Sequence, residues 1–292
     1  HIEVQILGDE HGNIVHLYER DCSLQRRFQK VVEFTPAFSL PPEVKQSILD
    51  DSLKLAKHVN YNNAGTLEFL VDRGGNHYFI EMNPRIQVEH TITEMCTGID
   101  LVRSQILVAE GYELSDEMIG IKSQEDIKQN GYAIQCRITT EDPSNNFAPD
   151  TGKITSYFSP GGFGVRLDGA TSGVGSVISP YYDSLLVKIT CWDNTFKNAC
   201  KKTLRAIQEI RISGVKTNIG FISNILTNPT FIEGKCHTKF IDETPELFNL
   251  DNGEDKSTKM LKYIATKTLA ESGHHKRYDE IRMPELTGNK PD

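Results

Sequence analysis

The chain has 292 residues, of which 38% are hydrophobic and 25% are charged, and its net charge at pH 7 is −8. This composition is typical of a soluble globular protein with one large domain or two medium ones, each able to bury a core. The negative charge is spread along the chain, which argues against a nucleic-acid surface. No apolar run of transmembrane length and no signal-peptide pattern is present, so we expect no membrane partner.

The cysteines predict the cellular compartment, and the first residue indicates that the chain is part of a longer protein. Six cysteines are scattered without CxxC spacing, which predicts free thiols rather than disulfides or a zinc site. We therefore expect a reducing compartment, the bacterial cytosol, or the mitochondrial matrix if the protein is eukaryotic. Because His1 opens directly into an alternating strand, we also expect the chain to be cut from the middle of a longer protein.

The first part of the chain mixes strands and helices. Apolar and polar residues alternate around glycine-containing turns in the strands, and the helices show apolar residues at helical spacing. We predict strands at residues 2–7, 14–19, 30–34, 66–71 and 77–82, and helices at residues 42–59 and 99–109, the second ending at Gly111.

A polar stretch at residues 115–130 separates a second part of the chain. There we predict strands at residues 132–139, 153–158, 164–168 and 185–192, and helices at residues 196–210 and 217–226. The charged stretch at 250–259 and the polar tail at 273–292 predict a linker or the beginning of another domain. Mixed elements with mostly antiparallel pairing give an α+β fold.

Two glutamates are predicted to face each other in the hairpin that follows the first helix. Gly74 and Gly75 suit a tight turn, because glycine tolerates positive φ. A turn centred between them places Glu68 opposite Glu81, with Cβ atoms roughly 5 Å apart, a destabilising arrangement for like charges. Asn83 shares the face of Glu81. Two carboxylates and an amide oxygen suit Mg²⁺ or Mn²⁺ bound with substrate phosphates; a solvated strand face is the ordinary alternative.

The sequence after the hairpin, Asn-Pro-Arg-Ile-Gln-Val-Glu-His, concentrates polar side chains beside this predicted metal site. Pro84 ends the strand and directs the loop that carries Arg85, Gln87, Glu89 and His90. A lone histidine such as His90 is more often a hydrogen-bonding residue than a ligand or a base.

Further basic residues are candidates for binding anions. Arg26, Arg27 and Lys30 would neutralise phosphate charge beside an acidic metal site, whereas an isolated Arg-Arg pair is more often a surface patch. Arg137 lies on the strand face opposite the apolar residues and would stabilise a developing anion; an exposed strand arginine is usually only solvated. The glycine run at residues 161–164 lacks phosphate-loop spacing and predicts a turn.

Several long segments match the ordered motifs of one enzyme family. They are HIEVQILGDEHGNIVHLYERDCSLQRRFQKVVE, FIEMNPRIQVEH, AIQCRITTEDP, GGFGVRLD and PYYDSLLVK. These segments resemble biotin carboxylase, an enzyme with the ATP-grasp fold, from about residue 2 to residue 248. DTGKITSY, GVKTNIGF and TKFIDETPELF are most similar to the biotin carboxylase region of pyruvate carboxylases, rather than of acyl-CoA carboxylases.

The resemblance implies three regions. Residues 1–114 would be the C-terminal part of an ATP-grasp domain, carrying the metal and bicarbonate site. Residues 115–248 would be the mixed α/β C-terminal domain of biotin carboxylase, with mostly antiparallel sheets. Residues 249–292, with TKMLKYIA, would be a linker or the start of the next domain.

The resemblance also implies a ligase activity. ATP would phosphorylate bicarbonate to carboxyphosphate, which carboxylates biotin on a separate carrier domain. In pyruvate carboxylase, a multifunctional enzyme of gluconeogenesis and anaplerosis, another domain then converts pyruvate to oxaloacetate. The family's N-terminal domain, glycine-rich lid and ATP-binding lysines would precede His1, so we expect this fragment to be inactive alone.

Site residues follow from the resemblance position by position. The metal ligands would be Glu68, Glu81 and Asn83. The bicarbonate ligands would be Lys30, Arg85, Gln87 and Val88. Glu89 would be the base, Arg137 would stabilise the biotin enolate, and Lys30 and Arg85 would complete the catalytic set. The ATP pocket would include His1, Gln25, Phe28 and Leu70, together with Glu68 and Glu81.

A departure from the family pattern and a glycine turn carry further implications. Phe28 stands where the family pattern has a histidine, so it can pack against a nucleotide but cannot hydrogen-bond to it. The glycine turn with Phe163 and Arg166 matches a subunit interface, which implies a homo-oligomer formed through the C-terminal domain.

Two alternative functions remain open from the sequence. One is another ATP-grasp ligase, such as an enzyme that makes carbamoyl phosphate. The other is a non-catalytic association or regulatory module, which predicts dimerisation that survives Glu81→Ala and Arg85→Ala.

Overall fold

The computed structural model describes residues 1–169, 173–250 and 256–271. The chain forms two compact units, His1–Leu250 and Asp251–Asp292. In the second unit the structure describes helix α8 (Lys256–Glu271). The polar tail predicted at residues 273–292, and residues 251–255 of the predicted charged stretch, lie outside the described residues.

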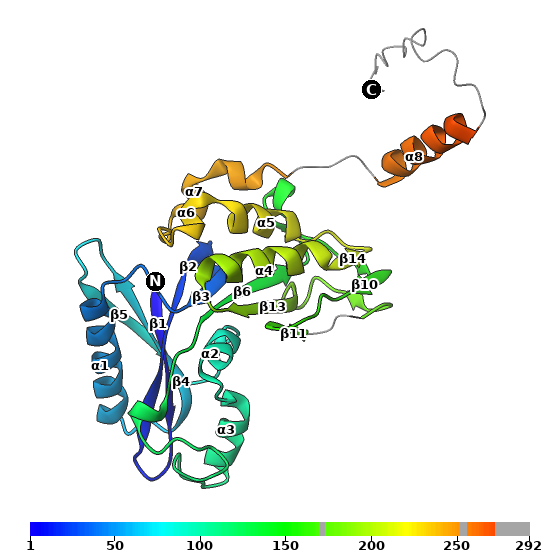
Figure 1. Ribbon diagram of the computed structural model, residues 1–292. Coiled ribbons are helices and arrows are strands. Elements are labelled where there is room, and N and C mark those ends of the chain that lie inside the picture. The colour runs from blue at the N-terminus through cyan, green and yellow to red at the C-terminus, as the bar shows by residue number, and fades with distance from the viewer. Residues whose placement is uncertain (170–172, 251–255, 272–292) are drawn as a thin grey trace. The chain divides into compact units, whose positions relative to one another are not determined.

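One eight-stranded sheet organises the first unit (Figure 1). Its strands, in spatial order, are β11 (Val165–Gly169), β13 (Leu185–Asp193), β6 (Tyr132–Thr139), β3 (Gln29–Thr35), β2 (Ile14–Arg26), β1 (Ile2–Gly8), β4 (Asn63–Val71) and β5 (His77–Asn83). All neighbouring strands in this sheet pair antiparallel. The predicted α+β class with mostly antiparallel sheets is confirmed.

Three small ladders complete the pairing of the described strands. They are β10 (Ser156–Phe158) with β14 (Arg211–Ser213), β12 (Val177–Ile178) with β9 (Gly152–Lys153), and β7 (Glu141–Asp142) with β8 (Ala148–Pro149). Because β3 pairs with β6, the large sheet joins the two regions expected at residues 1–114 and 115–248. That division stays a prediction.

Helices cover both faces of the sheet. Helix α1 (Pro42–His58) packs on the apolar face of β1 and β4, and α3 (Leu101–Ala109) packs on the opposite face near Leu7 and Ala64. Helices α4 (Phe196–Glu209) and α5 (Ile219–Thr227) cover the apolar face of β6 and β13. Helix α2 (His90–Thr97) lies against β6, β13, β2 and β3. The short helical turns are η1 (Gln124–Asp126), η2 (Pro143–Asn145), α6 (Pro229–Ile232), α7 (Phe240–Glu243) and η3 (Pro245–Phe248).

Three of the differences between the structure and the sequence prediction have a clear cause. The strand expected at 153–158 is split into β9 and β10, because the chain changes partners: the Ile154 N–H bonds to Ser176 O and the Thr155 N–H to Ser213 O. Strand β2 continues past residue 19, since its second half pairs with β3. Helix α2 was not predicted; it ends at Gly98, whose φ is 74°, and Asp100 then caps α3.

Two compositional predictions can be compared with the structure. All six cysteines are free thiols, and five of them are buried, as the absence of CxxC spacing predicts. Among the helices of the described residues, none has both the length and the apolarity needed to cross a membrane.

Candidate active site

A row of charged side chains crosses four neighbouring strands. Cross-strand pairing places Arg20 on β2 beside Glu3 on β1, Glu3 beside Glu68 on β4, and Glu68 beside Glu81 on β5. The predicted opposition of Glu68 and Glu81 is therefore confirmed. A β-bulge next to Glu68 produces it; continuing the register of the turn would have paired Glu68 with Ile80.

Asn83 lies beside both glutamates of the hairpin. Its Nδ2 donates to Glu68 Oε1 and to Glu81 Oε1, each at 3.1 Å. Two carboxylates and an amide form an oxygen-rich donor set that fits a hard divalent cation. Rotation of the Asn83 amide by half a turn would exchange its nitrogen for its oxygen and complete that set.

Lys30 is the cation at the centre of the acidic side chains. Its Nζ lies 2.5 Å from Glu3 Oε2, 2.9 Å from Glu68 Oε1 and 2.6 Å from Glu89 Oε1. Burial lowers the pKa of Lys30, but the surrounding negative charges, including Glu3 and Glu89, outweigh it and raise the pKa above its usual value. The ammonium therefore stays charged and bridges three strands and the loop.

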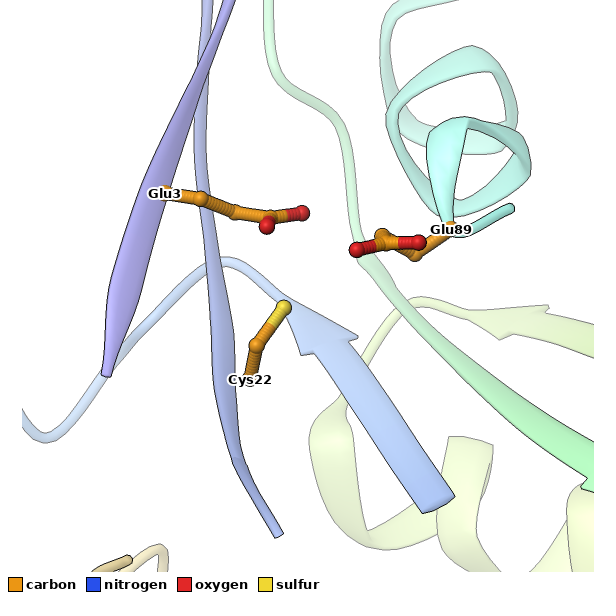
Figure 2. A group of neighbouring side chains, drawn as sticks. All are labelled: Glu3, Cys22 and Glu89. Carbon is orange, nitrogen blue, oxygen red and sulfur yellow. The ribbon is translucent and has the colours of Figure 1, made fainter. Parts of the chain in front are cut away.

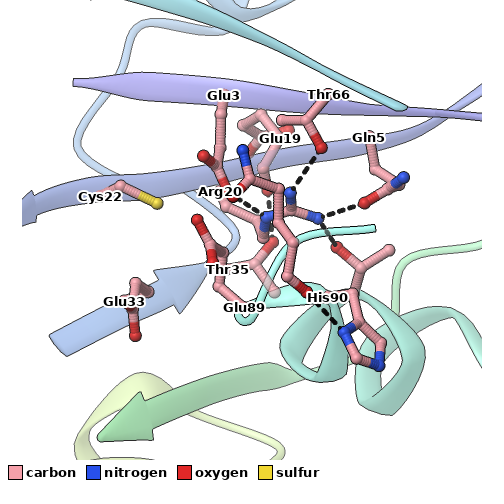
Figure 3. Close-up of polar contacts among 12 residues, drawn as sticks. Glu3, Gln5, Glu19, Arg20, Cys22, Glu33, Thr35, Thr66, Glu89 and His90 are labelled. Carbon is pink, nitrogen blue, oxygen red and sulfur yellow. Dashed lines mark hydrogen bonds and ion pairs between the residues drawn. The ribbon is translucent and has the colours of Figure 1, made fainter. Parts of the chain in front are cut away.

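Arg20 anchors a fully buried part of the network (Figure 3). Its Nε donates to Glu3 Oε1 at 2.5 Å, its Nη1 to Gln5 Oε1 at 2.8 Å and Thr93 Oγ1 at 3.0 Å, and its Nη2 to Thr66 Oγ1 at 3.2 Å. Burial raises the pKa of Glu3, but Arg20 and Lys30 lower it by more. Neither Glu3 nor Arg20 was predicted from the sequence as part of the site; strict alternation in the first strand was the available signal for Glu3.

Glu89 is fully buried between two cations. Its Oε1 lies 2.6 Å from Lys30 Nζ, and its Oε2 accepts from Arg137 Nη2 at 2.9 Å. Arg137 Nε in turn donates to Glu33 Oε1 at 2.6 Å. Arg85, the arginine nearest to Glu89 in the sequence, is not among its partners; Lys30 from β3 and Arg137 from β6 contact it instead.

The loop between β5 and α2 presents several hydrogen-bond donors. Arg85 is exposed, and its Nη1 donates to Ile86 O at 3.2 Å and to Gln87 Oε1 at 3.5 Å. Gln87 Nε2 donates to Glu68 Oε1 at 3.2 Å. Within the described part of the chain, the Val88 N–H has no hydrogen-bond partner. A guanidinium and an unpaired backbone N–H on one short loop suit a small anion.

The turn between β2 and β3 lies apart from this cluster. Arg26 Nη2 donates to Asn146 O at 2.8 Å, and Arg27 Nη2 donates to Asn146 Oδ1 at 3.3 Å, both at the surface. Of the predicted basic group, only Lys30 reaches the acidic residues. The Phe28 side chain is 96% exposed at the tip of the turn, so its place in a nucleotide pocket stays a prediction.

One of the predicted nucleotide residues, His1, contacts the acidic cluster directly, and Gln25 contacts His1. His1 Nε2 lies 2.7 Å from Glu68 Oε2, and its Nδ1 lies 2.5 Å from Gln25 Nε2. Leu70 follows Glu68 on the same face of β4 and is 44% exposed. Gln25 is therefore linked to Glu68 through His1, while a nucleotide-binding role for His1, Gln25 and Leu70 is still a prediction.

A second group of potential metal ligands overlaps the network (Figure 2). Ligand atoms of Glu3, Cys22 and Glu89 lie within 4.8 Å of one another, and all three residues are buried. However, Lys30 and Arg20 already neutralise the carboxylates. Burial, followed by the charge of Glu3, raises the pKa of the Cys22 thiol well above its usual range. A metal requires a thiolate, so we do not assign a metal to this group.

The residues predicted at a subunit interface lie on and beside β11. Phe163 is 83% exposed. Arg166 donates to both Asp168 carboxylate oxygens at 2.9 Å and to Glu94 Oε2 at 2.5 Å. An interface here stays a prediction.

Two family models and several curated proteins match this chain. Residues 1–117 match the family described as the carbamoyl-phosphate synthase L chain ATP-binding domain, and residues 135–243 match the biotin carboxylase C-terminal domain. The chain is 56% identical to pyruvate carboxylase of Aspergillus terreus over 292 residues, covering 98% of the chain and 24% of that protein. It is 57% identical to pyruvate carboxylase of Bacillus subtilis over 269 residues, covering 92% of the chain and 23% of that protein.

Solved structures of pyruvate carboxylase and of a biotin carboxylase domain also match this chain. Rhizobium etli pyruvate carboxylase with the allosteric activator acetyl coenzyme-A superposes with a TM-score of 0.86 and 49% identity, covering 100% of this chain and 29% of that one. The biotin carboxylase domain dimer of Hydrogenobacter thermophilus 2-oxoglutarate carboxylase was solved in complex with MgADP, ADP and bicarbonate. It superposes with a TM-score of 0.81 and 48% identity, covering 85% of this chain and 53% of that one. The chain thus spans about a quarter of the length of the curated relatives it matches.

Proposed function

Because the chain belongs to the biotin carboxylase part of the pyruvate carboxylase family, we propose that it supplies the metal and bicarbonate half of a biotin carboxylase site. One observation carries this proposal. Glu89, held between Lys30 and Arg137, lies beside the unpaired Val88 N–H and is linked through Lys30 to Glu68 of the hairpin pair. A base, hydrogen-bond donors for an anion and candidate metal ligands therefore lie close together.

The chemistry assigned to the loop is proton removal from bicarbonate. Arg85, the Val88 N–H, Gln87 and Lys30 would hold the anion by charge-assisted hydrogen bonds. Glu89 would accept the bicarbonate proton, and the freed oxygen would attack the γ-phosphorus of ATP, giving carboxyphosphate and ADP. Water must be excluded, because carboxyphosphate decomposes in it.

Glu68, Glu81 and the Asn83 oxygen would hold the divalent cation. Mg²⁺ or Mn²⁺, when bound there, would neutralise the charge of the ATP phosphates. His1, Gln25, Phe28 and Leu70 would line the nucleotide pocket beside these ligands.

Arg137 would stabilise the enolate of biotin once carboxyphosphate has formed. Its guanidinium is already oriented by Glu33 and Glu89, so little reorganisation is required. The biotin would arrive on a carrier domain, and the carboxyl group would pass to pyruvate elsewhere in the parent protein. A homo-oligomer contact through Phe163 and Arg166, and a reducing cellular compartment, complete the proposal.

Bicarbonate-dependent cleavage of ATP, stimulated by free biotin, tests this function in the intact protein that carries the chain. A carbamoyl-phosphate-forming ligase would require an amino donor and would ignore biotin. A purely associative module would form the same oligomers after Glu81→Ala and Arg85→Ala and would cleave no ATP.

The metal assignment predicts a specific binding defect. We expect Glu81→Gln to weaken Mn²⁺ binding in the presence of ADP by at least about tenfold, since even outer-shell partners of a metal contribute 10–100-fold. Electron paramagnetic resonance of free Mn²⁺ measures the affinity. Glu110→Gln, at the end of α3, is the matched control. Equal Mn²⁺ affinity in the two variants would remove Glu81 from the metal site.

A further inference from the structure

We propose that His90 and Lys188 are positioning residues that orient the main chain at Val88 for anion binding. The inference rests on the proposed role of this loop in holding bicarbonate. It assigns a task to two buried side chains that have no part in the chemistry described above, and one of them lies 100 residues away from the loop.

His90 fixes the peptide unit that precedes Val88. Its Nδ1 lies 2.6 Å from Gln87 O, and its backbone N–H reaches the same carbonyl at 3.3 Å. The ring, at the start of α2, is held on its other side by Glu94, whose Oε2 lies 3.7 Å from Nε2. In a trans peptide unit the C=O and N–H point in opposite directions. Binding of Gln87 O by His90 therefore aims the Val88 N–H away from α2.

Lys188 fixes the peptide unit that follows Val88. Its Nζ donates to Val88 O at 2.7 Å. The side chain extends from β13, where cross-strand pairing places it between Asp168 and Arg137. Only 8% of Lys188 is exposed, and among the described residues no carboxylate lies within salt-bridge distance of it. A buried ammonium is costly, and here its charge is directed at one backbone carbonyl.

Anchoring both peptide units leaves Val88 little freedom about its own two dihedral angles. Its N–H stays unpaired and oriented before an anion arrives, so less ordering is required on binding. The same anchor holds the residue that follows, Glu89, at the start of α2.

Steady-state kinetics of the intact protein tests the inference. We expect Lys188→Met and His90→Leu each to raise the KM for bicarbonate by about tenfold to a hundredfold, in line with loss of a hydrogen bond to a charged or buried donor. The KM for ATP should change little. Lys188→Arg and His90→Asn retain a donor near the original atom and should recover most of the loss. Lys202→Met is the matched control, because Lys202 Nζ donates to the Trp192 carbonyl at 2.8 Å, away from the loop.

The outcomes separate the two proposals. If the wild-type protein needs bicarbonate for ATP cleavage and Lys188→Met behaves like Lys202→Met, the positioning role is wrong and the proposed function stands. The positioning role is also wrong if the KM values for ATP and bicarbonate rise together and the conservative variants do not restore the KM for bicarbonate. If the wild-type protein cleaves ATP without bicarbonate, both proposals are wrong.

Discussion

Replacing Glu89 by glutamine is expected to lower kcat for bicarbonate-dependent ATP cleavage by about 10²–10⁴-fold, because it removes the proposed proton acceptor. The substitution conserves shape, and the remaining carbonyl oxygen can still accept from Lys30 or Arg137, which flank Glu89 at 2.6 and 2.9 Å. The KM for ATP should stay close to that of the wild type. Initial-rate measurements on the intact protein give both quantities.

Glu33→Gln is the matched control for that experiment. Glu33 is also fully buried and shares Arg137 as a partner, but it has no assigned role in proton transfer. Burial raises the pKa of Glu33 because it disfavours the charged carboxylate. Glutamine resembles the neutral, protonated side chain. We expect a much smaller loss of kcat. An equal loss in both variants would show that Glu89 acts only through the position of Arg137.

Replacing Arg20 by methionine is expected to destabilise the chain by about 3–5 kcal/mol, the usual result of removing one partner from a buried ion pair. Glu3 would lose the guanidinium that lies 2.5 Å away, while its side chain remains fully buried. Gln5 and Thr93 would each lose a hydrogen-bond donor as well. The midpoint of urea unfolding at pH 7 measures the change.

The double variant Arg20→Met/Glu3→Gln provides the comparison for this stability loss. Removing both charges avoids an uncompensated buried carboxylate, so we expect part of the stability to return. An Arg20→Met variant whose free energy of unfolding lies within about 0.5 kcal/mol of the wild type would behave like an ordinary surface substitution. That result would contradict a stabilising role for the buried Arg20–Glu3 pair.

Local patterns explain which features the sequence could predict. The Gly-Gly turn and the two-residue alternation of its strands predicted the hairpin and the opposition of Glu68 and Glu81, although the pairing is reached through a β-bulge that the pattern did not show. Gly75 indeed adopts a φ of 84° in that turn. The apolar face of β6 likewise predicted that Arg137 points away from the core under α4 and α5.

Features that depend on distant segments could not be predicted in this way. The insertion of Arg20 between Glu3 and α2 and the contact from Lys188 to Val88 both require the tertiary arrangement. Proximity in sequence likewise does not identify the cations that contact Glu89. Its nearest arginine along the chain, Arg85, turns outward, and its cations come from β3 and β6.

Relaxation of ¹³C-bicarbonate by bound Mn²⁺ tests most directly whether the hairpin and the loop form one site. The intact protein with Mn²⁺ and ADP should accelerate ¹³C relaxation well beyond free Mn²⁺. Glu81→Gln should abolish the effect by releasing the metal, and Arg85→Ala should abolish it while Mn²⁺ stays bound. Acceleration no greater than that of free Mn²⁺ in the wild type, or full acceleration in Arg85→Ala, would contradict the proposed site.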